Sequence, residues 1–200
     1  MLRKALVSSV ALFGLAATPA FALVTQFNLL GKAGAGLLGG NENQAVAVVG
    51  GSGGEVGAGI SFDDANNLLT INVAWGSGNS FVDLTGAAAA GHIHGVTAGI
   101  APASFDQNAP VLIGLNALPG FNGSATDGGF SGSVTLAAEN VANLFAGQLY
   151  LNFHTATYPG GEIRGNMVPI PEPATYALML GGLVAVAAYV RRRNRDANPA

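Results

Sequence analysis

The sequence predicts an all-β domain, a single antiparallel β-sandwich of immunoglobulin-like or Greek-key type, between two targeting segments. Thirty of the 200 residues are glycine and 10% are charged, which disfavours a helical bundle because glycine costs about 1 kcal/mol per interior helical site. Short apolar runs are separated by turns such as "GGSGGE" and "FNGSATDGG", a spacing typical of sandwiches. The chain has no cysteine, so core packing and sheet hydrogen bonds must hold it.

The N-terminal segment, residues 1–22, predicts a secretory signal peptide. Arg3 and Lys4 form a basic start, and an apolar run follows. Ala20 and Ala22 flank Phe21 in the small-x-small pattern of a cleavage site. The apolar run is shorter than the ~20 residues that a membrane span needs, which favours cleavage over an N-terminal anchor.

Nine short runs predict the strands of the domain, which we place at residues 23–168. The clearest alternates apolar Leu69, Ile71, Val73 and Trp75 with smaller or polar residues, the period-two pattern of a half-buried strand. Two glycine-rich stretches are interpreted as loops, at 34–40 and 50–59. The nine predicted strands are 25–29, 45–49, 68–75, 80–84, 91–94, 111–115, 129–136, 148–154 and 162–167.

Residues 137–148 predict the one short helix of the domain. Val141, Leu144 and Phe145 stand at i, i+3 and i+4, and Glu139 lies near the start of the segment. This spacing places the three apolar side chains on one helical face. We expect the helix to pack on the edge of the sandwich.

The charge of the domain excludes one class of partner. Lys32 and Arg164 are its only basic residues, against nine carboxylates, so two minus nine gives a charge of −7. A domain this acidic repels nucleic acid and anionic lipid head groups. We therefore expect no nucleic-acid partner.

The stretch "YLNFHTATYPGGEIRG", residues 150–165, predicts a polar cluster on a hairpin. Side chains i and i+2 of a strand share a face, so Asn152 pairs with His154 on one strand, and Glu162 with Arg164 on the next. The two strands are close in sequence and should pair antiparallel. We interpret the four side chains as a structural clasp that satisfies its own hydrogen bonds and closes the hairpin.

The histidines allow two other interpretations. The motif "GHIHG" puts His92 and His94 on one face of a strand; with His154 they would offer three nitrogens to zinc or copper. A catalytic interpretation makes His154 a base oriented by Glu162. No nucleophile motif accompanies that pair, and no serine lies in G-x-S-x-G. We therefore assign no catalytic residue and do not expect an enzyme.

The C-terminal segment predicts a transmembrane helix. Residues 174–190 carry no charge, and at about 1.5 Å per residue they reach about 26 Å, enough for a thin bilayer. Arg191, Arg192 and Arg193 follow directly, which is a stop-transfer pattern and disfavours a buried core helix. By the positive-inside rule the basic tail, residues 191–200, stays in the cytoplasm and the domain lies outside.

Pro171, Glu172 and Pro173, followed by an apolar helix and an arginine cluster, resemble the PEP-CTERM sorting signal. That signal is handled by exosortase, a membrane enzyme of Gram-negative bacteria that make extracellular polysaccharide. The prolines break the helix and leave residues 169–173 as an accessible linker. The resemblance implies that exosortase is a partner and that the tail is removed or transferred.

Two further stretches, "AAAAGHIHGVTAG" and "LFAGQLYLNFHTATYPGGEIRG", resemble the CHRD domain, first described in the animal protein chordin and common in bacterial exported proteins. The resemblance covers roughly residues 24–167, more loosely in the first third. One departure is Asn166-Met167, where the family more often has a glutamine and an aliphatic residue. No enzymatic activity is implied. The matching positions are His92, His94, Gly95, Leu144, Gly147, Tyr150, Asn152, His154, Thr155, Pro159, Gly161, Glu162, Ile163, Arg164 and Gly165.

These features predict an exported, non-enzymatic protein of the cell surface or of the extracellular matrix, as in a biofilm. Before processing we expect it at the inner membrane with its domain in the periplasm, and afterwards at the cell surface or outside. The expected partners are exosortase and either extracellular polysaccharide or other surface proteins, with no cofactor. The alternative is an exported module that binds zinc or copper through its histidines.

Overall fold

The structure, a computed structural model, describes residues 23–39, 50–123, 125–171 and 173–197. The predicted signal peptide with Ala20 and Ala22, the predicted strand 45–49 and Glu172 of the sorting motif lie outside the described residues. The described elements are β1 (Val24–Gly31), β2 (Gly34–Ala35), β3 (Leu38–Gly39), β4 (Gly53–Asp63), β5 (Leu68–Trp75), the 3-10 helix η1 (Ser77–Asn79), β6 (Ala88–His94), β7 (Val111–Gly114), β8 (Phe121–Asn122), β9 (Gly128–Thr135), α1 (Ala138–Phe145), β10 (Tyr150–Thr155), β11 (Ile163–Pro169) and α2 (Pro173–Ala197).

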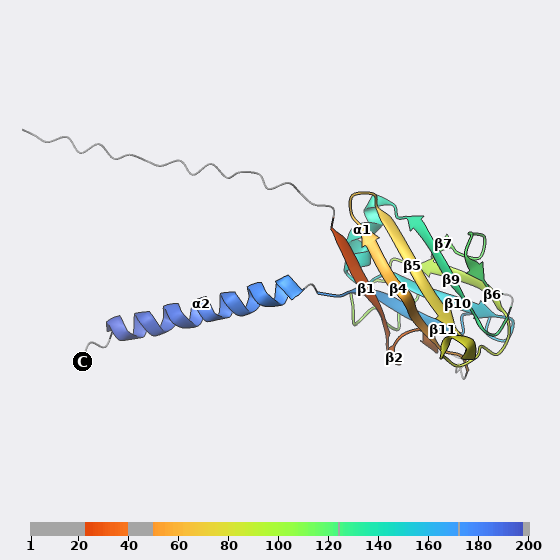
Figure 1. Ribbon diagram of the computed structural model, residues 1–200, viewed down its shortest axis with the longest axis horizontal. Helices are drawn as coiled ribbons and strands as arrows, with labels where there is room; N and C mark the ends of the chain where they lie inside the picture. Colours follow the sequence, from red (N-terminus) through yellow and green to blue (C-terminus); the bar gives the residue numbers. More distant parts are fainter. Residues whose placement is uncertain (1–22, 40–49, 124, 172, 198–200) are drawn as a thin grey trace, which may run out of the picture.

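The strands of the described residues form one antiparallel sheet of eleven strands (Figure 1). Nine strands follow the order β7-β6-β10-β11-β1-β4-β5-β9-β8, while β2 pairs with β1 and β3 pairs with β11. The prediction of a mostly β domain is confirmed, but the two-sheet sandwich is not. The reason is β1, which pairs with β4 through residues 24–27 and with β11 through residues 27–30. A strand bonded on both sides joins what would otherwise be two sheets.

The sheet curls into a half-barrel around one core. Its edge strands β7 and β8 are joined by residues 115–120 alone, so the two edges cannot lie far apart. The Trp75 ring on β5 has its centroid 4.7 Å from that of Phe153 on β10 and 6.2 Å from that of Phe121 on β8. Side chains from distant strands therefore share a single apolar core.

Most predicted strands lie where the sequence placed them. β5 covers the predicted range 68–75, and its alternate residues Leu69, Ile71, Val73 and Trp75 are buried as expected. Six other predicted strands overlap β1, β6, β7, β9, β10 and β11. Short apolar runs bounded by turn residues were sufficient to predict these strands.

The glycine-rich stretch 50–59, predicted as a loop, lies mostly in β4. A Cβ added to Gly53 would lie 2.5 Å from the carbonyl oxygen of Ala74 on β5, so glycine permits a close approach of the two strands. The pairing of β4 with β5 shifts register between Glu55 and Ile60. Glycine here marks tight packing and a bulge rather than an unpaired loop.

Two smaller predictions also fail. The predicted loop 34–40 contains β2 and β3, and the predicted strand 80–84 is replaced by η1 and a turn. The turn places Ser80 in the left-handed region, at φ 67°. The backbone N–H of Ser77 donates to Asp83 Oδ1 at 2.6 Å, and this bond holds the pKa of Asp83 below its usual range.

The short helix is confirmed as α1. Leu144 is fully buried, and Val141 packs against the core. The ring of Phe145 lies edge-on to those of Phe27 and Phe62, with centroids 5.4 and 6.0 Å apart. The i, i+3, i+4 pattern therefore identified the face that covers the sheet.

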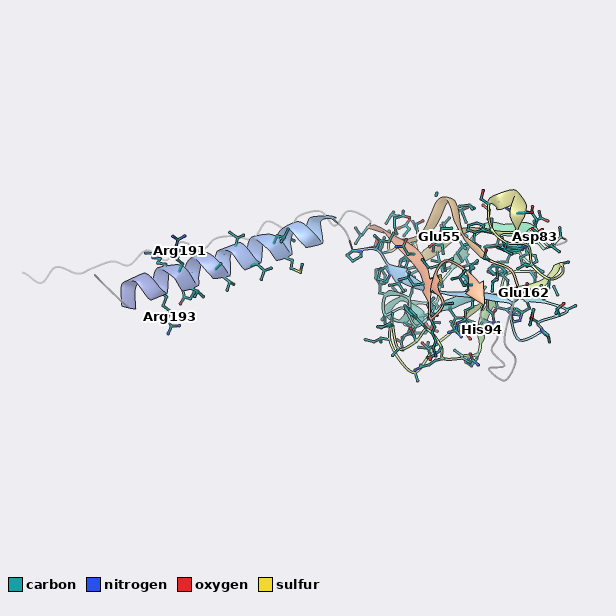
Figure 2. The ribbon with its side chains drawn as sticks, turned by 90° about the horizontal axis from the view of Figure 1, so that it is seen from below. Glu55, Asp83, His94, Glu162, Arg191 and Arg193 are labelled. Carbon is teal, nitrogen blue, oxygen red and sulfur yellow. The ribbon has the colours of Figure 1, made fainter. Side chains whose placement is uncertain are left out.

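The C-terminal segment is helical in α2, with Arg191 and Arg193 exposed near its end (Figure 2). Within the described residues, no helix is both long enough and apolar enough to traverse a lipid bilayer. The predicted transmembrane helix 174–190 is thus not confirmed. Its reach of about 26 Å falls short of a hydrocarbon core of ~30 Å, so the prediction depended on a thin bilayer.

Replacing Gly53 tests the close approach of β4 and β5. We expect Gly53→Ala to lower the free energy of unfolding by about 2 kcal/mol, because the added methyl group meets backbone rather than a flexible side chain. The measurement is urea unfolding followed by the fluorescence of Trp75, the single tryptophan. Gly86→Ala is the matched control, since its Cβ would meet nothing within 4 Å. Equal stability of the two variants would contradict the packing described here.

Candidate functional site

Polar residues cover the outer face of strands β6, β10 and β11, on the side opposite the core. The register pairs Tyr150 with His94 and with Asn166, and Asn152 with His92 and with Arg164, and directly paired residues share a face. All six residues of β10 are buried, so other segments must cover this side. We call the following set the polar face: His92, His94, Tyr150, Asn152, His154, Arg164 and Asn166.

The connection between β6 and β7, residues 95–110, lies over the polar face; we call it the cover loop. It is bonded to the segment that enters β10. The hydroxyl of Ser104 donates to the carbonyl of Gly147 at 2.8 Å, and the N–H of Thr97 donates to the carbonyl of Gln148 at 3.2 Å. The cover loop is therefore an ordered part of the structure that seals one side of the sheet.

Arg164 is the main link between the polar face and the cover loop. Its guanidinium donates to the carbonyl oxygens of Gln107 at 2.6 Å and Ser104 at 3.3 Å, and to Asn108 Oδ1 at 3.2 Å. The same group lies over the ring of Tyr150, 3.5 Å from its centroid. The residue is only 8% exposed, so carbonyl dipoles and an aromatic face replace its water.

Tyr150 and His94 continue this arrangement. Their rings stack at 4.8 Å with an interplanar angle of 11°. Both reach Ala109 of the cover loop: His94 Nδ1 lies 2.9 Å from its carbonyl oxygen, and the tyrosine hydroxyl accepts its N–H at 3.0 Å. Arg164, Tyr150 and His94 thus form a row of stacked groups, and each of the three is hydrogen-bonded to the cover loop.

Glu162 fixes a different segment. Its carboxylate accepts hydrogen bonds from the N–H and the hydroxyl of Thr85 at 2.8 and 2.7 Å, from the hydroxyl of Thr155 at 2.7 Å and from the N–H of Gly51 at 3.2 Å. It is fully buried. A buried carboxylate needs such donors, so Glu162 anchors the connections on either side of the β4–β5 pair to the hairpin.

The side chains of the predicted clasp have other hydrogen-bond partners than expected. The four side chains were expected to satisfy one another's hydrogen bonds, but within the described residues the donors to Glu162 are all threonine and glycine groups. The amide of Asn152 is buried with no hydrogen-bond partner among the described residues. The four predicted residues do lie around the hairpin. Two of them, Glu162 and Arg164, hold connections 56 to 111 positions away, while His154 Nδ1 bonds within the hairpin to the carbonyl of Pro159.

The three histidines converge. His92 Nδ1 lies 2.9 Å from His154 Nε2, and one ring nitrogen of each of His92, His94 and His154 lies within 4.8 Å of the others. His154 Nδ1 bonds to the carbonyl of Pro159 at 2.9 Å. His92 is partly exposed, whereas the other two are buried. The candidate residues taken from the sequence are thus brought together.

Several groups of this site could not be found from the sequence. Ser104 and Ala109 form hydrogen bonds with residues of the polar face, and Thr85 forms one with the carboxylate of Glu162. No local sequence motif distinguishes these three residues. The partners of Arg164 lie 56 to 60 residues upstream. Backbone carbonyls have no sequence signature, so only the fold reveals them.

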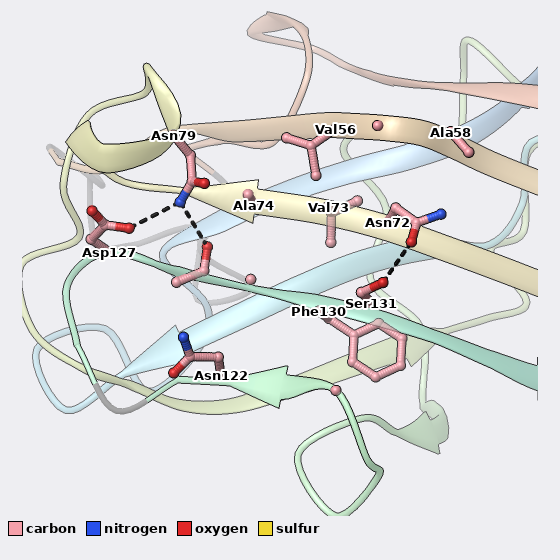
Figure 3. Close-up of a pocket in the computed structure, with 14 residues that line it drawn as sticks. Val56, Ala58, Asn72, Val73, Ala74, Asn79, Asn122, Asp127, Phe130 and Ser131 are labelled. Atoms are coloured by element: carbon pink, nitrogen blue, oxygen red, sulfur yellow. Dashed lines mark hydrogen bonds between the residues drawn. The ribbon is translucent and has the colours of Figure 1, made fainter.

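A separate polar groove of about 550 Å³ lies on the other half of the sheet, along β4, β5 and β9 (Figure 3). The hydroxyl of Ser131 donates to Asn72 Oδ1 at 2.7 Å. Asn79 Nδ2 donates to Asp127 Oδ1 at 2.9 Å. Asn122 also lines the groove, and its side chain is exposed. Amide, hydroxyl and carboxylate groups therefore dominate its polar lining.

Arg164 is tested by charge-conserving and charge-removing substitutions. We expect Arg164→Ala to lose about 3 kcal/mol of stability, because several hydrogen bonds to a charged group and one cation–π contact disappear together. Arg164→Lys should recover less than half, since an ammonium cannot reproduce the planar fork. Urea unfolding measures both.

The control for Arg164 is Lys32→Ala. Lys32 also bonds the cover loop, through Asp106 Oδ2 at 2.9 Å, and its side chain is 76% exposed. This contact holds the pKa of Asp106 below its usual range. Exposed pairs contribute little, so the loss should stay below about 0.5 kcal/mol. Similar losses for Lys32 and Arg164 variants would refute the role given to the buried arginine.

Glu162 is tested in the same way. Glu162→Ala removes the acceptor of four hydrogen bonds, two of them from the buried residues Gly51 and Thr155, and we expect a loss of about 3 kcal/mol. Glu162→Gln keeps one acceptor oxygen for the two N–H groups, while the threonine hydroxyls can rotate to accept, so it should lose less. Glu139→Gln, at an exposed position of α1, is the control. A glutamine variant as unstable as the alanine variant would argue against this bonding pattern.

Two family models match the sequence of this protein. The CHRD domain matches residues 34–167, and the PEP-CTERM protein-sorting motif matches residues 169–193. The search of curated proteins returned no match, and neither did the search of solved structures. The CHRD match covers more than half of the chain and includes the polar face and the cover loop. The chain therefore belongs to the CHRD domain family and ends in a PEP-CTERM sorting motif, which implies that it is exported and processed by exosortase.

Proposed function

We propose that the protein is a non-enzymatic component of the cell surface or extracellular matrix, which exosortase releases or attaches and which associates with extracellular polysaccharide. The observation that carries this proposal is the adjacency of the two family matches, at 34–167 and 169–193. A single residue separates the domain from its sorting motif, so the domain is the cargo. It passes through the periplasm and ends at the surface or outside.

The bonding of the charged residues supports a role without catalysis. A catalytic pair would need Glu162 beside His154. Instead the carboxylate is bound by Thr85, Thr155 and Gly51, and His154 Nδ1 is bonded to a backbone carbonyl. The two groups serve to hold segments of the fold together. Their arrangement favours a binding module over an acid–base site.

The polar groove supports polysaccharide as the ligand. Its volume of about 550 Å³ lies in the range of small-molecule sites. The amides of Asn72, Asn79 and Asn122, together with the Asp127 carboxylate, line it. Such groups donate and accept hydrogen bonds in the way that sugar hydroxyls require. The charge of −7 on residues 23–168 favours a neutral or basic glycan over an anionic one.

One experiment tests sorting and association together. In cells with exosortase, we expect the protein to lack its C-terminal segment by intact-mass analysis and to occur in the surface or extracellular fraction. In a strain without exosortase, the mass of the unprocessed tail should remain. The extracellular form should also elute with the polysaccharide from the same cells during size-exclusion chromatography, and treatment with glycosidase should release it.

The two parts can fail separately. An unchanged mass in both strains, or mature protein in the cytoplasm, would contradict the sorting proposal. Correct processing, with elution at the size of the free protein before glycosidase treatment, would contradict only the association with polysaccharide.

A further inference from the structure

We propose that His92, His94 and His154 bind one copper or zinc ion on the polar face. These side chains come from two neighbouring strands, β6 and β10, and one nitrogen of each lies within 4.8 Å of the others. The site is separate from the sorting motif and from the polar groove. It adds a metal-binding activity to the proposed surface role and does not depend on that role.

Two of the rings are held in the tautomer that a metal requires. His154 Nδ1 lies 2.9 Å from the Pro159 carbonyl oxygen, and His94 Nδ1 lies 2.9 Å from that of Ala109. A carbonyl oxygen only accepts, so Nδ1 carries the proton in both rings and the lone pair of the neutral ring is on Nε2. Metal-binding histidines are typically oriented by such a bond from the other nitrogen.

The third ring is already close to ligand spacing. His92 Nδ1 lies 2.9 Å from His154 Nε2, and two nitrogens at 2.0–2.1 Å from a tetrahedral ion are about 3.4 Å apart. Since His154 Nε2 accepts, His92 Nδ1 donates that hydrogen bond in the metal-free protein. A metal ion takes the place of this proton, which moves through solvent to His92 Nε2. The ligating nitrogen of His94, which lies within 4.8 Å of the other two, completes the set after a small shift of its ring.

The strands and the cover loop hold these rings in position. His92 and His94 lie on β6, which pairs with β10 in register, and sites on strands are more rigid than sites on loops. His94 stacks on Tyr150 at 4.8 Å, and its carbonyl partner belongs to the cover loop. The bonds of Arg164 to that loop thus also fix the orientation of a metal ligand.

The neighbouring Asn152 gives an independent indication. It lies directly opposite His92 in the register, is fully buried, and has neither amide atom hydrogen-bonded to a described residue. Buried amides are almost always bonded, and an exception calls for a water or an ion nearby. A water on the remaining coordination position of the ion would supply the Asn152 amide with a hydrogen-bond partner.

The donor set selects the ion. Three imidazoles suit copper and zinc, whereas calcium and magnesium require oxygen ligands. The chain has no cysteine, and the carboxylate of Glu162 already accepts four hydrogen bonds. The negative charge of residues 23–168 attracts cations to the surface. Three protein ligands leave a fourth coordination position for a water.

The test uses the mature protein recovered from cells, freed of metal with a chelator, and titrated separately with Cu²⁺ and Zn²⁺. We expect one ion per chain by elemental analysis and a rise in Tm of roughly 5–10 °C at a hundredfold excess over Kd. Copper should bind more tightly than zinc. The electron paramagnetic resonance spectrum of the copper form should show coupling to imidazole nitrogens.

The variants separate ligation from stability. His92→Ala removes a partly exposed ligand, and we expect at least a hundredfold loss of affinity with the metal-free Tm changed by only a few degrees. Asp83→Asn, which changes an exposed carboxylate, should leave affinity unchanged. Stoichiometric binding of either ion with loss in His92→Ala supports the site. Absence of stoichiometric binding by the folded wild-type protein, or unchanged affinity and nitrogen coupling in His92→Ala, would overturn it.

Discussion

A buried guanidinium constrains the outer side of this sheet. Arg164 is almost excluded from water, so it must find its hydrogen bonds inside the protein. It finds them in backbone carbonyls of the cover loop, and it stacks on Tyr150. This requirement brings the cover loop down over β6, β10 and β11. The loop then buries the polar face and places the Ala109 carbonyl against His94.

Glu162 imposes the corresponding constraint at the other end of the hairpin. Its carboxylate collects donors from the connections before β4 and before β6. Ile163, between the two charged residues, is buried in the core. The segment "EIRG" therefore holds three distant connections through its two charged side chains, and contacts the apolar core through Ile163. A short sequence signature can in this way organise segments far from it in the chain.

Local patterns in the sequence predicted the elements but not their assembly. Alternation at Leu69 to Trp75 and the spacing of Leu144 and Phe145 depend on neighbours a few residues away, and both predictions are confirmed. The shared bonding of β1 by β4 and β11 depends on strands far apart, so a continuous sheet could not be distinguished from a sandwich. The glycine-rich stretch at β4 was predicted as a loop, but glycine permits close packing of the strands there.

The same limit applies to the candidate site. The i, i+2 rule correctly placed His92 with His94, and Asn152 with His154, on common faces. The expected partners of Glu162 were wrong, because its donors are mainly backbone groups and hydroxyls from other segments. The central claim is that the cover loop is as ordered as the strand beneath it. Native-state hydrogen exchange of the Ala109 amide tests it most directly, since that N–H donates to Tyr150. The account predicts protection within about 1 kcal/mol of the amides of β10; exchange at the rate of an unstructured peptide, with β10 still protected, would contradict it.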